Sequence, residues 1–242
     1  MAQPPVPPAT GPAPIASWQR QIGQRVTTLC WLKALGTTAF MWVFFLFYFE
    51  LLHHPRYPIT VMPDTWIDRA VTFSPDWVII YFSLWVYVSL PGALQRDLRG
   101  LLWHGASALL MCAAGLAFYN CYPTTFMQPR VDWSSQPLGQ ILQSVDAPGN
   151  AFPSMHVAYA LFAWAWIRHE LHEVRAPRWL HILSLLWCMA IGFSTLATKQ
   201  HVWWDVLAGI VLGLSAGSIA VLATRWRKGL PLRKPITSPL EP

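Results

Sequence analysis

The chain has 242 residues, of which 54% are hydrophobic and 12% charged, against about 25% charged in ordinary soluble domains. The hydrophobic residues form blocks of about 20, the length an α-helix needs to cross a bilayer, which excludes a soluble globular core. We therefore predict an all-α polytopic membrane protein. Basic residues in cytoplasmic loops explain the net charge of +6, so we expect no nucleic-acid partner.

The four cysteines lie in or beside apolar blocks and form no C-x-x-C pair. Neither a zinc site nor a disulfide framework is therefore indicated, and the cysteines are interpreted as small buried hydrophobic residues. They are Cys30, Cys112, Cys121 and Cys188.

The chain divides into two tails and an apolar middle. Residues 1–16 hold six prolines and no charge, which is typical of a disordered segment rather than of a signal peptide. We predict a disordered, cytoplasmic tail at 1–28, a transmembrane domain at 29–225 and a basic, proline-containing cytoplasmic tail at 226–242. The middle contains six apolar blocks, each predicted to be a membrane-spanning helix: 30–52, 77–94, 100–121, 153–168, 179–197 and 202–224.

Basic residues are unevenly distributed between the two ends of these blocks. Thirteen of the 17 Lys and Arg residues lie at one end. The other end carries Arg56, Arg69, Arg130 and Lys199. Positively charged loops remain in the cytoplasm, so we predict that both termini are cytoplasmic. The loops 53–76 and 122–152 would then face outward, toward the periplasm of a bacterial inner membrane.

Ionisable side chains at the edge of a membrane span are costly, so each is a candidate for function. The segment KQHVWWD places His201 and Asp205 four residues apart at the start of the sixth block. On a helix both lie on one face, where a carboxylate can orient an imidazole and raise its basicity. Equally, the pair could do no more than tether the end of a helix.

A second candidate, the segment NAFPSMH, opens the fourth block. Ser154 is expected as the N-cap or in the first turn after Pro153, with His156 beside it. Backbone N–H groups at such a helix start can bind an anion. The alternative is a plain helix start with a histidine at the membrane interface.

Two cations lie on the same predicted side of the membrane. Arg130 is in the second outward loop and Lys199 in the turn before the sixth block, and each could instead be an ordinary solvated or interfacial side chain. Together with the histidines and the helix start, they could converge on a phosphate. Cations and amides would neutralise its oxygens, one histidine would attack, and the other would protonate the leaving group.

These segments resemble the motifs of the type-2 phosphatidic acid phosphatase (PAP2) superfamily, whose members have a core of six membrane helices with three motifs at its outer rim. The second motif, Pro-Ser-Gly-His, is similar to PSMH at 153–156. The third, Ser-Arg followed by His and by Asp four residues later, is similar to ST at 194–195 with His201 and Asp205.

Several positions depart from the family pattern. The first motif, a lysine and seven residues later an arginine followed by proline, retains only Arg130, because Pro123 replaces the lysine and the proline precedes the arginine. Met155 replaces glycine, and Thr195 replaces arginine, for which Lys199 is the nearby substitute cation. These variants look more like the branch that includes inositol phosphorylceramide synthases, whose members transfer a phosphoryl-containing headgroup between lipids.

The resemblance implies a role for each residue. His201 would be the nucleophile that forms a phosphohistidine, Asp205 would orient it, and His156 would act as general acid and then as base. The phosphate would be bound by Arg130, Lys199 and Ser154. No metal ion or other cofactor is implied.

Three functions are compatible with these features. The first is a membrane phosphatase that hydrolyses a lipid phosphomonoester or diphosphate through a phosphohistidine at the outer face. The second is a lipid phosphotransferase with the same intermediate and an alcohol acceptor. The third is a non-enzymatic cofactor or transport protein that binds haem through paired histidines, although His104 and His181 are predicted on the opposite side from His156 and His201. The expected partners are a lipid phosphate substrate, membrane lipids and, in the second case, the acceptor.

Overall fold

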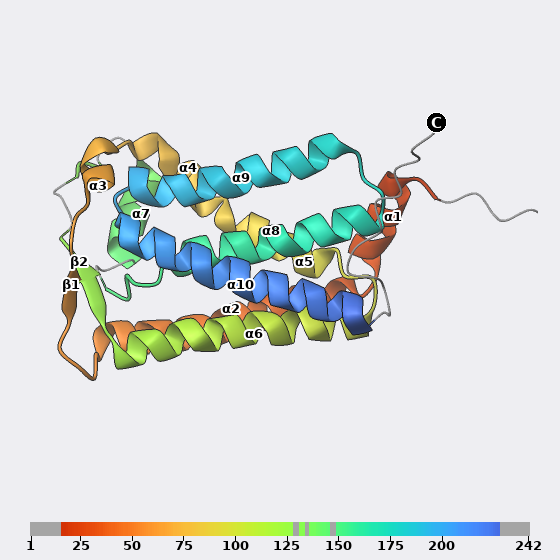
Figure 1. Ribbon diagram of the computed structural model, residues 1–242, viewed down its shortest axis with the longest axis horizontal. Coiled ribbons are helices and arrows are strands. Elements are labelled where there is room, and N and C mark those ends of the chain that lie inside the picture. The colour runs from red at the N-terminus through yellow and green to blue at the C-terminus, as the bar shows by residue number, and fades with distance from the viewer. Residues whose placement is uncertain (1–15, 128–130, 134–135, 146–148, 228–242) are drawn as a thin grey trace, which may run out of the picture.

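Among the residues that the structure describes, five helical segments are long and apolar enough to cross a membrane, which indicates an integral membrane protein. The computed structural model describes residues 16–127, 131–133, 136–145 and 149–227, and the helices run along its long axis (Figure 1). The five segments are α2 (Cys30–His53), Pro75–Ala93, α6 (Leu98–Cys121), α9 (Arg178–Ala197) and the Trp203–Trp226 part of α10 (Trp203–Arg227).

The second of these segments is interrupted. It consists of η1 (Pro75–Trp77), α4 (Val78–Phe82) and α5 (Leu84–Ala93). At the joint between α4 and α5, the Ser83 hydroxyl donates to the carbonyl of Ile80 at 2.6 Å and accepts from the indole of Trp187 at 2.8 Å. A hydroxyl bonded to the preceding turn bends a helix, and here the same group also ties the bend to α9.

The prediction of exactly six spans is not confirmed, because the fourth apolar block behaves differently. It forms α8 (Met155–Glu173), which is not apolar enough to count as a span. Eleven of its 19 residues are buried, including the charged Glu170. α8 lies within the bundle against α5, α9 and α10, so much of its surface faces protein instead of lipid and need not be apolar (Figure 1).

One end of the bundle, here called the site end, carries the longer connections. There β1 (Thr60–Met62) pairs in parallel with β2 (Thr124–Phe126), which joins the loop after α2 to the loop after α6. α3 (Trp66–Ala70) begins with a capping box formed by Thr65 and Asp68. α7 (Pro137–Val145) and the first residues of α8 and α10 lie at the same end (Figure 1).

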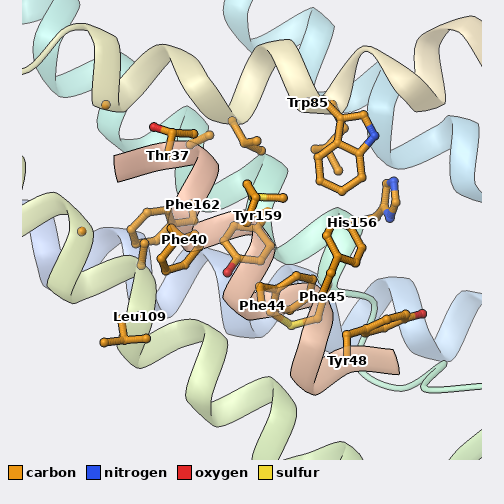
Figure 2. A pocket seen from close by; sticks show the side chains of 18 of the residues that line it. Thr37, Phe40, Phe44, Phe45, Tyr48, Trp85, Leu109, His156, Tyr159 and Phe162 are labelled. Carbon is orange, nitrogen blue, oxygen red and sulfur yellow. The ribbon is translucent and has the colours of Figure 1, made fainter. Parts of the chain in front are cut away.

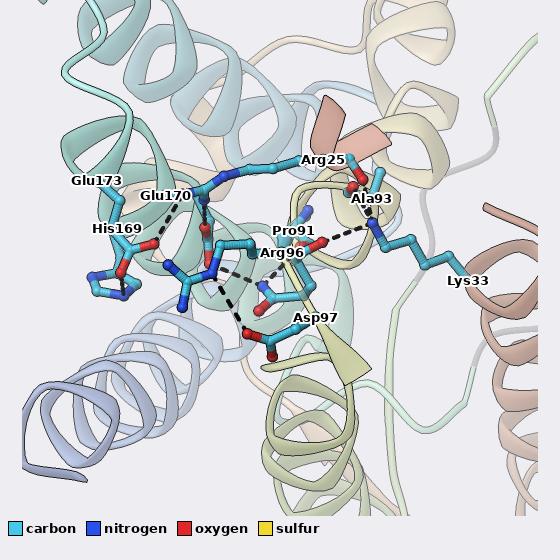
Figure 3. Close-up of polar contacts among 10 residues, drawn as sticks. Arg25, Lys33, Pro91, Ala93, Arg96, Asp97, His169, Glu170 and Glu173 are labelled. Carbon is cyan, nitrogen blue, oxygen red and sulfur yellow. Dashed lines mark hydrogen bonds and ion pairs between the residues drawn. The ribbon is translucent and has the colours of Figure 1, made fainter. Parts of the chain in front are cut away.

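The opposite end, here called the far end, carries α1 (Trp18–Thr27), which falls inside the stretch 1–28 predicted as a disordered tail. Arg25 in its last turn is buried and donates to Glu170 and to Glu173 of α8 (Figure 3). These charge-assisted hydrogen bonds hold α1 against the bundle, which explains why this part of the stretch is ordered.

α8 and α10 approach each other more closely than ordinary side chains allow. Gly209, Gly213 and Gly217 repeat every four residues along α10 and face α8. A Cβ at Gly209 would overlap the carbonyl oxygen of Ser154, and a Cβ at Gly213 would overlap that of Ala158. This stripe has the small-xxx-small pattern by which membrane helices pack. It sets the separation of the two helix starts at the site end.

We expect Gly213→Ala to destabilise the protein by about 1–3 kcal/mol, because the added methyl group must displace the backbone of α8. Thermal unfolding in detergent measures the effect. Gly192→Ala in α9 is the matched control: a Cβ there meets nothing within 4 Å, so the change should be neutral or stabilise by up to about 1 kcal/mol. Equal Tm values for the two variants would contradict the close contact.

Candidate active site

The turn between α9 and α10 presents His201 at the site end. After α9 ends at Ala197, Lys199 adopts a left-handed conformation with φ of 57°. The amides of Gln200 and His201 then both donate to the carbonyl of Thr195, at 3.0 and 3.2 Å. The chain is thereby folded back over the end of α9, and α10 begins directly after this turn.

Asp205 anchors the turn from within α10. Its side chain is fully buried, and Oδ2 accepts from the amide of Val202 at 3.1 Å. The same oxygen lies 3.5 Å from Nδ1 of His201, an ion-pair distance too long for a well-formed hydrogen bond. Because Nδ1 faces the carboxylate, Nε2 is the ring nitrogen left for another group. Oδ1 of Asp205 has no hydrogen-bond partner among the described residues.

The start of α8 is joined to this turn through the backbone. The amide of Ser154 donates to the carbonyl of Asp205 at 3.0 Å. Ser154 is the N-cap of α8, is fully buried, and accepts from the amide of Val157 at 3.4 Å. The serine hydroxyl therefore helps to order the helix start that carries His156.

His156 lies in the first turn of α8, and its ring centroid is 6.4 Å from that of His201. The ring stacks on Tyr81 of α4 with centroids 4.1 Å apart, and Nδ1 lies 3.4 Å from the Tyr81 hydroxyl. Trp85 approaches from α5 (Figure 2). Nε2 of His156 is buried and has no partner among the described residues, so it can exchange a proton with a bound ligand.

Lys199 and Asp68 hold α3 against the turn. The Lys199 ammonium donates to the carbonyl of Asp68 at 2.8 Å and to that of Val71. The Asp68 carboxylate accepts from the amide of Trp203, the first residue of α10, at 2.7 Å. Two of the three ammonium protons are thus used on backbone carbonyls, and one is left for another acceptor.

The structure therefore brings four of the six predicted site residues to the contact between α8 and α10. A fifth, Lys199, lies in the same turn, but its described bonds go to the α3 region. Arg130, the sixth, lies outside the described residues.

Within the described part of the chain, metal-ligand atoms gather in a different place. His169, Glu170 and Glu173 at the far end have potential ligand atoms within 4.8 Å of one another. Both carboxylates accept hydrogen bonds from Arg25, so they form an ion-pair cluster (Figure 3). The cluster is near the opposite end of α8 from His156, too far away to take part in chemistry there.

The sequence model of the PAP2 superfamily matches residues 101–229, more than half of the chain. The protein belongs to the PAP2 superfamily. The matched segment contains most of α6 and all of α8, α9 and α10, and therefore both histidines and the glycine stripe. Membership suggests a membrane enzyme of the phosphatase or phosphotransferase type, with membrane lipids as partners. Comparisons with curated proteins and with solved structures find no match.

Three contributors to this candidate site were not predicted from the sequence. Asp68 could have been found, because TWID at 65–68 has the spacing of a capping box. The glycine stripe could also have been found from its four-residue period. No local sequence pattern predicts the role of Tyr81, because that role depends on a ring stack with His156, which is 75 positions away in the chain.

We expect Lys199→Met to lower stability by about 1–2 kcal/mol, because it removes two charge-assisted hydrogen bonds while keeping the side-chain length. Asp68→Asn weakens the same contact between the α3 region and the turn, through the bond from the Trp203 amide to the Asp68 carboxylate. The losses of stability in the two single variants should therefore not be additive in the double variant. Thermal unfolding of the single and double variants measures the coupling. Fully additive losses would mean that the two residues do not act through one contact.

Proposed function

We propose that this PAP2 protein is an integral membrane lipid phosphatase that hydrolyses a lipid phosphomonoester or diphosphate through a phosphohistidine. One observation carries the proposal: His201 lies beside the buried Asp205, and the ring of His156 is 6.4 Å away with its Nε2 unbonded among the described residues. Two imidazoles in different settings supply the nucleophile and the acid that a two-step displacement requires.

His201 is the proposed nucleophile. Asp205 on the Nδ1 side favours the tautomer with the proton on Nδ1 and the lone pair on Nε2. Attack of Nε2 on phosphorus forms the phosphorus–nitrogen bond and breaks the bond to the lipid oxygen. The ring becomes positively charged in this step, and the carboxylate beside it stabilises that charge.

His156 is the proposed general acid and base. It would give a proton to the departing lipid oxygen and then take one from the water that hydrolyses the phosphohistidine. The Tyr81 stack supports this assignment, because it fixes the ring and places the hydroxyl near Nδ1. Nε2 is then the nitrogen that exchanges the proton.

Two helix starts, two cations and a buried serine are assigned to the binding of the phosphate. The starts of α8 and α10 lie together, and helix N-termini attract anions. Arg130 and the remaining proton of Lys199 are the proposed cations. Ser154 is proposed to contribute as the buried cap of α8. No metal ion is part of the proposal.

The second candidate is a lipid phosphotransferase with an alcohol acceptor, similar to inositol phosphorylceramide synthases. Met155 and Thr195 favour it, because they depart from the phosphatase motifs in the direction of that branch. Product analysis separates the two: free phosphate released by purified protein without an acceptor supports the phosphatase, and turnover only with an added alcohol supports the transferase.

We further propose that the site end faces the periplasm of a bacterial inner membrane and that both termini are cytoplasmic. In support, α1 and the end of α10 lie at the far end, together with the more basic loops (Figure 1). The substrate headgroup would then be reached from the outer leaflet.

We expect His201→Ala to abolish phosphate release and Asp205→Asn to lower kcat by about 10²–10⁴-fold, the usual range for loss of acid–base assistance. The measurement is phosphate release from a panel of lipid phosphates, together with trapping of labelled phosphoenzyme by acid-free quenching. Labelled protein should be absent for His201→Ala and should accumulate for His156→Ala. His172→Ala near the far end is the matched control and should keep its activity. Full activity of His201→Ala on every substrate would refute the mechanism.

We expect a cysteine at the site end to react with an impermeant thiol reagent on intact cells. Tyr57, 56% exposed in the loop after α2, is replaced by cysteine in a protein whose exposed Cys30 and Cys121 are changed to serine. Gln24→Cys in α1 is the counterpart and should react only after lysis. The reverse pattern would overturn the orientation.

A further inference from the structure

A cavity of about 540 Å³ begins at the two histidines and runs through the bundle along α2. His156 and His201 line the end of the cavity at the site end of the bundle. Lys33 and Gly92 line its other end, here called the inner end, which lies toward the far end of the bundle. Figure 2 shows a row of aromatic rings between Thr37 near one end and His156 at the other. The candidate active site is therefore the mouth of a deep space inside the protein.

The walls of this cavity suit a hydrocarbon. Its aromatic rings include Phe40, Phe44, Phe45, Tyr48, Tyr159 and Phe162. Among the described lining residues there is no Asp or Glu. Such walls offer dispersion contacts to an apolar chain, and carboxylates that would repel a phosphate at the mouth are missing from that lining.

The cavity is long relative to the membrane. Lys33 and Phe49 of α2 both line it, and the 16 residue steps between them, at about 1.5 Å each, give a wall of about 24 Å. The hydrocarbon core of a bilayer is about 30 Å thick. A chain attached to a headgroup at His201 could therefore extend past the bilayer midplane while it remains in contact with the cavity walls.

Three helices converge to form the inner end. A Cβ added at Gly92 of α5 would lie 3.9 Å from both the Thr37 hydroxyl of α2 and the His104 ring of α6. Lys33 at the same end donates to three backbone carbonyls. Its ammonium is therefore paired, and the cavity floor does not present an unpaired charge to an apolar chain.

We propose that this cavity holds one hydrocarbon chain of the lipid phosphate, and that the space around Gly36, Gly92 and Gly105 at its inner end selects substrates by the length of that chain. The inference rests on the proposed function, because it takes the phosphate to bind at His201. Continuity with both histidines favours the chain of the substrate over an unrelated membrane lipid. Bilayer and cavity are both apolar, so selection comes from packing and not from transfer out of water.

The test compares kcat/KM for octyl phosphate and octadecyl phosphate in mixed detergent micelles. Gly36→Leu and Gly105→Leu fill the inner end, since both glycines line the cavity and a Cβ at either meets nothing within 4 Å. Each should lower kcat/KM for octadecyl phosphate about tenfold, the order expected for overfilling a packed site, and leave that for octyl phosphate unchanged.

The control is Gly192→Leu, the same substitution at an equally open helical position outside the cavity lining, which should leave both values unchanged. If the two cavity variants change kcat/KM equally for both substrates, or change it for neither, the chain-selecting cavity is refuted while the phosphatase proposal stands. If wild type releases no phosphate from these or any other lipid phosphates or diphosphates, the proposed function itself fails.

A second measurement needs no turnover. Octadecyl phosphate carrying a diazirine at its chain end is photolysed with the His201→Ala protein, and the adducts are mapped. Adducts on residues 33–41 and 92–109 that excess octadecyl phosphate suppresses support the proposal. Adducts confined to the outer, lipid-facing surface, and unaffected by the competitor, overturn it even if the leucine variants fold poorly.

Discussion

The close contact between α8 and α10 is the constraint on which the rest of this structure depends. Three glycines of α10 leave no side chain between the two backbones, so the carbonyls of Ser154 and Ala158 lie against α10 directly. At the site end the same contact continues as a hydrogen bond from Ser154 to Asp205. His156 belongs to α8 and His201 to the turn that leads into α10, so their separation is set by this packing. Without this packing the chain would contain the residues of the candidate site, but they would not lie close together.

Polar groups at the two ends of the bundle are satisfied in different ways. At the far end, Arg25 donates to two carboxylates and Lys33 to three backbone carbonyls, which makes their burial tolerable and closes the bundle. At the site end, Nε2 of His156 and Oδ1 of Asp205 are buried without partners among the described residues. Ionisable groups buried at the edge of a membrane span are candidates for function. These atoms, together with the apolar cavity that opens at the same histidines, are the basis for the proposed chemistry at the site end and for the proposed lipid chain along α2.

Local hydropathy predicted the long apolar helices well. The blocks at 30–52, 100–121 and 179–197 differ from α2, α6 and α9 by no more than two residues at either end, because a membrane span is defined by its own composition. The fourth block was predicted as a span like the others, but α8 faces other helices, and no property of its own sequence shows which surface its neighbours cover. The ordering of α1 and the pairing of β1 with β2 were not predicted for a related reason, since each depends on a partner far away in the chain.

The sequence by itself determined the membrane character, the positions of the apolar helices and the residue types of the two motifs that identify the family. The four-residue spacing predicted that His201 and Asp205 lie close together on one helix face; the two side chains are close, but His201 lies in the turn before α10 and not on that helix. Only the tertiary structure decided that His156 stacks on Tyr81, that Lys199 turns to the carbonyls of Asp68 and Val71, and that a cavity along α2 ends at the histidines. These features arise where helices from distant parts of the chain meet. Spacing along one helix cannot specify them, because they depend on how closely its neighbours pack.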